Sequence, residues 1–273
     1  LHGVESFGKA WELPNASAYA ETCAAIGLVF FAHRMLQIEP DGHYADVMER
    51  ALYNGVLSGV SLDGERFFYV NPLASDGGHH RQDWFGCACC PPNIARLLAS
   101  LGRYAYSASQ GTAWVHLYAA GRATLDVEGR ELTLAAETDY PWDGRVRIVV
   151  QSADVVDLAL SLRIPRWCRK YRLSVNGESV RTRPIRGYVK LRRRWRAGDH
   201  IELDLDMPVE RIAAHPNVAE DAGRVALQRG PIVYCLEGCD HEVDVRSIVL
   251  PDGEKLTPRF ERNLLGGCTV LRG

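Results

Sequence analysis

The chain has 273 residues, of which 47% are hydrophobic and 24% charged, and this balance predicts a folded protein with a sizeable core. The formal net charge is -2 and the pI is near 6.5, so the chain has no overall positive field that would attract nucleic acids or anionic membranes. Neither is an expected partner. The longest apolar run, residues 24–31, is much shorter than the roughly 18 to 20 residues of a membrane span. Localisation stays open, with a cytoplasmic protein favoured.

Residues up to about 107 are predicted to form helices, because their apolar positions recur at three- and four-residue spacing. The first helix ends before Pro40, and its expected apolar side comprises Cys23, Ile26, Phe30 and Met35. The second runs from about His43 to Ser58. The third begins at Pro91-Pro92, where the missing N–H groups cost nothing, directly after a cluster of cysteines.

From about residue 110 the period of the apolar residues changes to two, which predicts strands and a β-sandwich. The expected strands are 114–118, 123–127, 131–135, 146–151, 156–164, 171–175, 188–191 and 201–205. Asn176-Gly177 is typical of a two-residue hairpin turn that needs positive φ. The stretches 224–236 and 242–250, after a break at His215-Pro216-Asn217, predict the start of a second β domain.

Three of the eight cysteines lie in the run Cys87-Ala88-Cys89-Cys90. Adjacent cysteines are poor disulfide partners because the small ring strains the peptide bond, whereas a soft cation accepts two neighbouring thiolates. With Glu21 and Cys23, the residues Cys89 and Cys90 provide a donor set suited to tetrahedral Zn²⁺. The scattered cysteines are expected to be buried thiols: Cys168, Cys235, Cys239 and Cys268.

The spacing of Glu21 and Cys23 constrains the first helix. Residues two apart on an α-helix point about 200° away from each other, so these two share a metal only if the backbone there is not yet helical. We therefore expect the regular helix to begin near Thr22 and not at Asn15. Cys89 and Cys90 precede the third helix, whose N-terminus favours the reactive thiolate form. On these residues alone a closed structural zinc site is favoured, since four protein ligands leave no open position.

Four stretches of the sequence resemble glycoside hydrolase family 127, the family of β-L-arabinofuranosidases. They are Ala18-Tyr19-Ala20-Glu21-Thr22-Cys23, Tyr69-Val70-Asn71-Pro72-Leu73, the run from Trp84 to Ile94 and the run from Leu162 to Cys168. The resemblance covers essentially the whole chain. It implies an α+β multidomain protein in which helices of an (α/α)6 barrel are followed by β-sandwich domains.

The resemblance also implies roles for site residues. Glu21, Cys23, Cys89 and Cys90 would be zinc ligands, and Cys89 would be the nucleophile that forms a covalent glycosyl-cysteine. Glu5 corresponds to the family's acid/base glutamate, with Glu12 as its competitor. The activity implied is a zinc-dependent retaining hydrolysis that releases β-L-arabinofuranose or a related furanose from a small oligosaccharide or glycoside. The resemblance therefore favours a catalytic zinc site over the structural one that the residues alone favour.

Other interpretations stay open. Tyr69 is either a sugar contact or a buried aromatic residue at a strand end. His79 and His80 lie on a glycine-rich loop, where solvent exposure is favoured over a contact with substrate or zinc. The basic run Arg192–Arg196 is expected to lie on a solvated sheet face. The alternative function is a non-catalytic carbohydrate-binding or scaffold protein with a structural zinc site, and a redox-sensitive thiol protein has less support.

The expected organisation is the C-terminal portion of an (α/α)6 catalytic barrel at 1–107, a β-sandwich at 108–210 and the start of a second β-sandwich at 211–273. Twelve helices of ordinary length need on the order of 200 residues, which is more than the first segment offers. We therefore expect the chain to retain the site residues but to have weak or no activity by itself. Its oligomeric state is left open.

Overall fold

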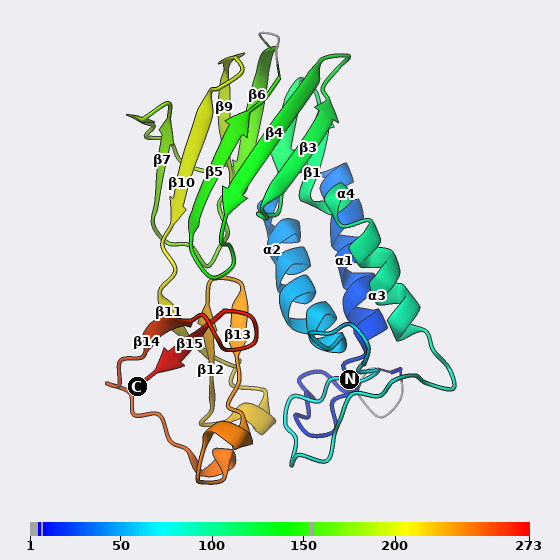
Figure 1. The fold of residues 1–273 in the computed structure, drawn as a ribbon. Coiled ribbons are helices and arrows are strands. Elements are labelled where there is room, and N and C mark those ends of the chain that lie inside the picture. The colour runs from blue at the N-terminus through cyan, green and yellow to red at the C-terminus, as the bar shows by residue number, and fades with distance from the viewer. Residues whose placement is uncertain (1–4, 7, 153–155) are drawn as a thin grey trace. The chain divides into compact units, whose positions relative to one another are not determined.

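The computed structural model describes residues 5–6, 8–152 and 156–273, in which helices precede several β-sheets (Figure 1). The fold is therefore of the α+β multidomain class that the sequence predicts. The chain divides into two compact units, each built from separate segments. The first comprises Leu1–Ile26, Ala51–Ile94 and Pro208–Gly273, and the second Gly27–Arg50 and Ala95–Met207. In the described segments, no helix has the length and apolar character to cross a membrane.

Helix α1 spans Thr22–Ile38, so it begins at the residue predicted from the ligand spacing. Before it, Glu21 forms an isolated β-bridge with Val70, which keeps this residue out of the helix. Thr22 is fully buried; its N–H donates to the Tyr69 carbonyl (2.9 Å) and its hydroxyl donates to the Phe68 carbonyl (2.8 Å). The start of α1 is thus held against the segment that contains Tyr69.

A glycine is required beside the start of α1. A Cβ on Gly59 would lie 2.6 Å from Thr22 Cγ2 and 2.7 Å from Thr22 Oγ1, which is closer than side-chain atoms approach one another. Gly59 ends a short 3-10 helix, Leu57–Gly59, that follows a π-helical turn at Leu52–Val56. The absence of a side chain therefore permits the close packing that places Thr22, and with it Glu21.

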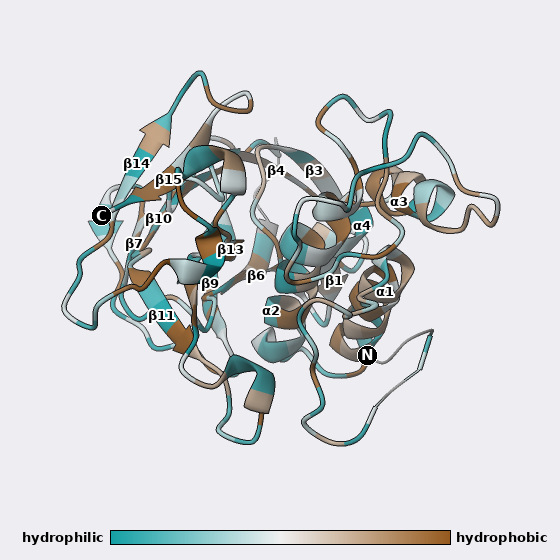
Figure 2. Ribbon diagram, turned by 90° about the horizontal axis from the view of Figure 1, so that it is seen from below, coloured by the Kyte–Doolittle hydropathy of each residue, from teal (hydrophilic) through white to brown (hydrophobic). Residues whose placement is uncertain are grey.

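The expected apolar side of α1 is confirmed only at Ile26. The buried residues are Ile26, Val29, Ala32 and Leu36, while Phe30 and Met35 are only half-buried. The opposite side is also apolar, because Phe31 is 60% exposed and Ile38 is 77% exposed. Figure 2 shows hydrophobic residues along much of this helix. A helix that is apolar nearly all round carries no single stripe from which its buried face can be read.

The second predicted helix changes type along its length. Helix α2 covers Gly42–Ala51 and continues as the π-helical turn and the 3-10 helix described above. In the π-helical turn, the Asn54 side chain donates to the Pro231 carbonyl and accepts from the Val233 N–H, each at 2.9 Å. These bonds join the turn to β13 (Ile232–Tyr234) within the first unit. Helix α3 spans Cys90–Ala99 and the short α4 spans Gly102–Ala105.

Two sheets build the β part of the second unit. The four-stranded sheet has the order β1-β2-β6-β9 and the six-stranded sheet the order β3-β4-β5-β10-β7-β8. Their bounds are β1 Tyr106–Ser109, β2 Thr112–Val115, β6 Val156–Arg163, β9 Tyr188–Trp195, β3 Gly121–Asp126, β4 Glu131–Thr138, β5 Arg145–Val150, β10 His200–Leu205, β7 Tyr171–Val175 and β8 Glu178–Ser179. The predicted Asn176-Gly177 turn joins β7 to β8, with φ of 53° and 81°.

A buried ion cluster joins α2 to β6 inside the second unit. Arg163 is fully buried, and its guanidinium contacts Asp46 (2.7 Å) and Glu49. Glu49 also accepts hydrogen bonds from the Tyr140 hydroxyl (2.5 Å) and the Trp167 indole N–H (3.2 Å). Two carboxylates on successive turns of the helix therefore share one arginine of the sheet.

His116 is a second buried polar residue of this unit. Its Nδ1 lies 2.7 Å from the Tyr188 hydroxyl and its Nε2 lies 2.8 Å from Ser107 Oγ. Burial lowers the pKa of the His116 imidazole to about 3, and the positive charge of Arg163 adds to the effect. The ring is therefore neutral in the folded protein across the physiological range.

Acidification should destabilise the protein through His116. Its unfolded-state pKa is about 6.5, so below that pH the unfolded chain binds a proton that the folded chain does not. The free energy of unfolding should fall by about 2 kcal/mol for this group between pH 7 and pH 5, and fall further toward pH 3. Urea unfolding at several pH values measures this. His116→Gln should show a smaller loss, and an unchanged pH slope in that variant would contradict the assignment.

The C-terminal part of the first unit holds a sheet of β11 (Val209–Ala213), β12 (Val225–Arg229) and β13, and a hairpin of β14 (Thr257–Glu261) and β15 (Cys268–Arg272). The predicted extended stretch 242–250 is wrong, because it contains a 3-10 helix, Val245–Ser247. The Asp244 side chain caps that helix by accepting from the Arg246 N–H (2.9 Å). Such local side-chain bonds compete with strand formation.

Candidate functional site

The structure brings together the four residues proposed as metal ligands. One side-chain donor atom from each of Glu21, Cys23, Cys89 and Cys90 lies within 4.8 Å of the other three. Glu21 and Cys23 flank the first residue of α1, whereas Cys90 is the first residue of α3. All four belong to the first unit, so the cluster forms within one compact body.

The spacing of the donor atoms leaves room for a cation. Cys89 Sγ lies 3.5 Å from Glu21 Oε1 and 3.7 Å from Cys90 Sγ, and Cys90 Sγ lies 3.8 Å from the same Glu21 oxygen. Cys90 is fully buried, while Cys23 and Cys89 are half-buried. Thiolates and a carboxylate at these separations can hold a metal ion.

Burial acts against ionisation of the supporting cysteines. It raises the pKa of the Cys23 and Cys90 thiols, and the neighbouring thiols raise the pKa of Cys90 further. A bound cation has the opposite effect, because it deprotonates a coordinating thiol. The electrostatics of the cluster therefore favour neutral Cys23 and Cys90 thiols in the absence of metal, whereas a bound cation would favour their thiolates.

Tyr69 contacts the cysteine that the resemblance marks as nucleophile. Its hydroxyl lies 3.1 Å from Cys89 Sγ, and the residue is half-buried. The contact with Cys89 raises the pKa of the Tyr69 phenol, and burial and the charge of Glu21 raise it further. The phenol therefore keeps its proton and can donate it in a hydrogen bond to an ionised sulfur. Its predicted contact with a sugar remains a prediction.

Glu5 and Tyr19 lie in the same region of the first unit. The Tyr19 ring packs edge-on against Tyr69, with 6.3 Å between centroids. Burial raises the pKa of Tyr19, and the charges of Glu21 and Glu5 raise it further. Glu5 is exposed and lies outside helices and strands, with φ of 39°. The competing carboxylate of Glu12 accepts the Lys9 N–H (2.9 Å) in a local turn.

The two histidines of the glycine-rich loop differ. His80 is exposed, but His79 is half-buried: its Nε2 lies 2.9 Å from the Val70 carbonyl oxygen and its ring stacks on Phe68 with 4.8 Å between centroids. The expectation of a solvated side chain is therefore wrong for His79. Neither histidine belongs to a potential metal cluster among the described residues. His79 instead supports the segment that pairs with the start of α1.

Cysteines outside the cluster have other environments. Cys87 is exposed, and Cys168 is buried as expected. Cys235 and Cys239 are exposed, which corrects the expectation of buried thiols. Cys235 directly follows β13, and Cys239 lies in a 3-10 helix, Gly238–Asp240. Cys239 approaches Glu237 and Asp240 in a second group of possible donors, but all three are exposed and such groups are common without a metal.

Family models match nearly the whole chain in three consecutive parts. Residues 1–103 match the β-L-arabinofuranosidase GH127 catalytic domain, 112–207 the GH127 middle domain and 209–264 the glycoside hydrolase family 127 C-terminal domain. The chain belongs to glycoside hydrolase family 127. The compact units of the structure interleave the segments that these three models match.

Relatives in family 127 are similar over almost all of this chain. A non-reducing end β-L-arabinofuranosidase of Bifidobacterium longum subsp. longum is 42% identical over 99% of the chain and 44% of its own length. The structure of a GH127 β-L-arabinofuranosidase from Geobacillus stearothermophilus T6 is 50% identical, with a TM-score of 0.91, over 96% of this chain and 43% of that one. A second GH127 β-arabinofuranosidase structure is 42% identical, with a TM-score of 0.94, over 97% and 44%. The chain thus spans less than half the length of these relatives.

Asn93 is a site residue of this family 127 chain that sequence reasoning missed. Its Nδ2 donates to Cys23 Sγ (3.2 Å), and its backbone N–H donates to the Cys89 carbonyl (3.2 Å). The hydrogen bond from Asn93 lowers the pKa of Cys23, against the larger effect of burial. The Asn93 side chain on α3 therefore orients Cys23, the one proposed metal ligand that lies within α1.

Replacing Asn93 should weaken metal binding without preventing it. Residues that orient metal ligands typically contribute about 10- to 100-fold in affinity, so the dissociation constant of Zn²⁺ in Asn93→Ala should rise about tenfold. Competition with a chromophoric chelator measures this constant directly. Leu98→Ala, a change at a partly exposed position of the same helix, is the control. Equal affinities of Asn93→Ala and the parent protein would contradict the role of Asn93.

Proposed function

We propose that the protein carrying this chain is a zinc-dependent retaining glycoside hydrolase that releases β-L-arabinofuranose or a related furanose. The observation that carries the proposal is the environment of Cys89, whose sulfur contacts Glu21, Cys90 and the Tyr69 hydroxyl while staying half-buried. A sulfur held in this way is available to a substrate, and the Tyr69 hydroxyl is placed to donate a hydrogen bond to it once a bound cation has ionised it. The similarity to β-L-arabinofuranosidases supports the substrate class.

The donor spacing supports zinc as the cation. With Zn–S near 2.3 Å and Zn–O near 2.0 Å, a tetrahedral site has S···S edges of about 3.8 Å and S···O edges of about 3.5 Å. In the structure the Cys89–Cys90 and Cys89–Glu21 separations are 3.7 and 3.5 Å, and the Cys90–Glu21 separation is 3.8 Å. Bound zinc would stabilise the ligand sulfurs as thiolates and make Cys89 a better leaving group. Cys23 and Cys90 would serve as supporting ligands.

In the first step, the Cys89 thiolate attacks the anomeric carbon of the sugar. A C–S bond forms as the bond from that carbon to the leaving oxygen breaks, and protonated Glu5 gives its proton to the departing oxygen. The Tyr69 hydroxyl lies 3.1 Å from Cys89 Sγ, so it would donate a hydrogen bond to the sulfur once that sulfur is ionised and would orient it. The product of this step is a glycosyl-cysteine with inverted configuration.

In the second step, ionised Glu5 takes a proton from water, and the resulting oxygen attacks the anomeric carbon. The C–S bond breaks, its electrons return to Cys89, and the second inversion restores the original configuration. Sulfur here replaces the carboxylate nucleophile of ordinary retaining glycosidases, so the spacing rule for carboxylate pairs does not apply. The net reaction is hydrolysis with retention.

The proposal is tested by following the anomers formed by the full-length protein. With 4-nitrophenyl β-L-arabinofuranoside as substrate, proton NMR should show the β-anomer of arabinose first and the α-anomer only later by mutarotation. Initial formation of the α-anomer would contradict the retaining mechanism. Sugar binding without hydrolysis of any furanoside would instead establish the alternative, a non-catalytic carbohydrate-binding or scaffold protein with a structural zinc site.

A further inference from the structure

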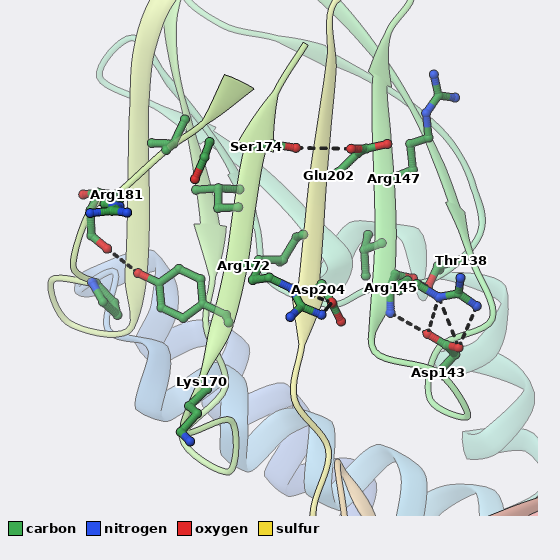
Figure 3. Close-up of a pocket in the computed structure, with 18 of the residues that line it drawn as sticks. Thr138, Asp143, Arg145, Arg147, Lys170, Arg172, Ser174, Arg181, Glu202 and Asp204 are labelled. Atoms are coloured by element: carbon green, nitrogen blue, oxygen red, sulfur yellow. Dashed lines mark hydrogen bonds and ion pairs between the residues drawn. The ribbon is translucent and has the colours of Figure 1, made fainter. Parts of the chain in front are cut away.

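A large groove lies on the six-stranded sheet of the second unit. Its volume is about 1330 Å³, and it is lined by residues of β5, β7 and β10 and of the segment that follows β8 (Figure 3). All of its lining residues belong to the second unit, and none of them belongs to the cysteine cluster. The groove therefore shares no residue with the candidate catalytic centre.

One part of the groove offers paired donors and acceptors. Three ion pairs join neighbouring side chains here: Arg145 with Asp143 (3.0 Å), Arg147 with Glu137 (3.0 Å) and Arg172 with Asp204 (2.5 Å). Ser174 donates to Glu202 at 3.2 Å, and Figure 3 shows that pair above Arg172 and Asp204. Exposed ion pairs contribute little to stability, so these groups can exchange partners with a bound ligand at small cost.

Another part of the groove carries cations without carboxylate partners. Lys170 precedes β7, while Arg181 and Arg183 follow β8, the strand at the edge of the sheet. The segment after β8 is held to β7, because the Val180 N–H donates to the Leu173 carbonyl (2.8 Å) and the Tyr171 hydroxyl donates to the Thr182 carbonyl.

These contacts hold the segment that carries Arg181 and Arg183 alongside β7, which Lys170 precedes. Figure 3 shows Arg181 and Lys170 on one side, with Arg145 and Asp143 on the other. All three cations are exposed, and none of the ion pairs within the described segments includes them. This side of the groove therefore carries exposed positive charge that attracts an anionic group.

We propose that the groove binds an acidic oligosaccharide. A uronate carboxylate would lie at the side of Lys170 and Arg181, and sugar hydroxyls would lie along the side that carries the three ion pairs. Hydroxyl groups donate and accept at once, so they suit a surface that alternates guanidinium and carboxylate groups. A polyanion such as a nucleic acid or a sulfated chain does not suit it, because Glu202 and Asp204 would repel a charge at every position. The proposal does not depend on the hydrolytic function, since the groove shares no residue with that site.

The proposal is tested by calorimetric titration of the full-length protein with three probes. They are xylotetraose, a xylo-oligosaccharide of similar length that carries one glucuronic acid, and a heparin tetrasaccharide. The singly acidic oligosaccharide should bind at least about tenfold tighter than either of the others. Equal affinity for the neutral probe, tightest binding of heparin, or no binding of the singly acidic probe would each overturn the proposal.

Paired variants locate the site. Arg181→Ala/Arg183→Ala should weaken binding of the singly acidic oligosaccharide at least about tenfold. Arg194→Ala/Arg196→Ala removes the same charge from exposed positions that do not line the groove, and it should leave the affinity unchanged. Both pairs replace exposed side chains, and thermal unfolding checks that each variant is folded. Equal losses in the two variants would show a nonspecific charge effect and contradict the site.

Discussion

Replacement of Cys89 by serine should lower the turnover of 4-nitrophenyl β-L-arabinofuranoside by the full-length protein at least about a thousandfold, or about 4 kcal/mol in activation free energy. Serine keeps an oxygen that can still approach a cation, but a hydroxyl is a much weaker nucleophile than a thiolate at neutral pH. The measurement is kcat/KM of the variant, together with its zinc content by atomic emission spectroscopy.

The control for this substitution lies two residues away. Cys87 is exposed and outside the donor cluster, so Cys87→Ser should retain the activity of the parent protein. Loss of both activity and zinc in Cys89→Ser would show only that Cys89 holds the metal. Zinc retained with activity lost supports the nucleophile, whereas zinc retained with full activity would contradict it.

Replacement of Arg163 by methionine should destabilise the protein by about 3–5 kcal/mol, because it leaves two carboxylates buried without a counter-charge. The side chain of Arg163 is 0% exposed, and the side chains of its partners Asp46 and Glu49 are 12% and 2% exposed. Urea unfolding followed by circular dichroism measures the loss. Adding Glu49→Gln to Arg163→Met should recover part of it, since one of the unpaired charges is then removed.

The matched control is an arginine–aspartate pair on the surface of the same unit. Arg172 contacts Asp204 at 2.5 Å, but the Arg172 side chain is 88% exposed. Arg172→Met should therefore cost no more than about 1 kcal/mol. Similar losses of stability in Arg163→Met and Arg172→Met would mean that burial does not determine how much these ion pairs contribute to the free energy of unfolding.

Local chemistry was sufficient to predict several elements. The requirement that Glu21 and Cys23 share a metal placed the start of α1 at Thr22, where the structure has it. The period of two identified the strands of the second unit other than β1 and β8, and Asn176-Gly177 identified the β7–β8 turn. These features depend on residues close together in the sequence, so spacing and turn chemistry are enough to reveal them.

Other features depend on contacts between distant residues and could not be predicted. Asn93 reaches Cys23 across 70 positions of the chain, and half-buried His79 stacks on Phe68. The four-residue β1 was missed because it directly follows α4 and is too short for a clear alternation. The groove beside Lys170 likewise exists only because the segment after β8 folds back onto β7.

Peptide mass spectrometry of the full-length protein tests the central claim most directly, after rapid acid quenching during turnover of a substrate with a good leaving group. The proposed mechanism predicts a pentosyl adduct on the peptide that contains Cys89, which accumulates and then disappears as substrate is consumed. A pentosyl adduct on Glu5 or Glu21 with Cys89 unmodified would contradict the assignment of Cys89 as nucleophile.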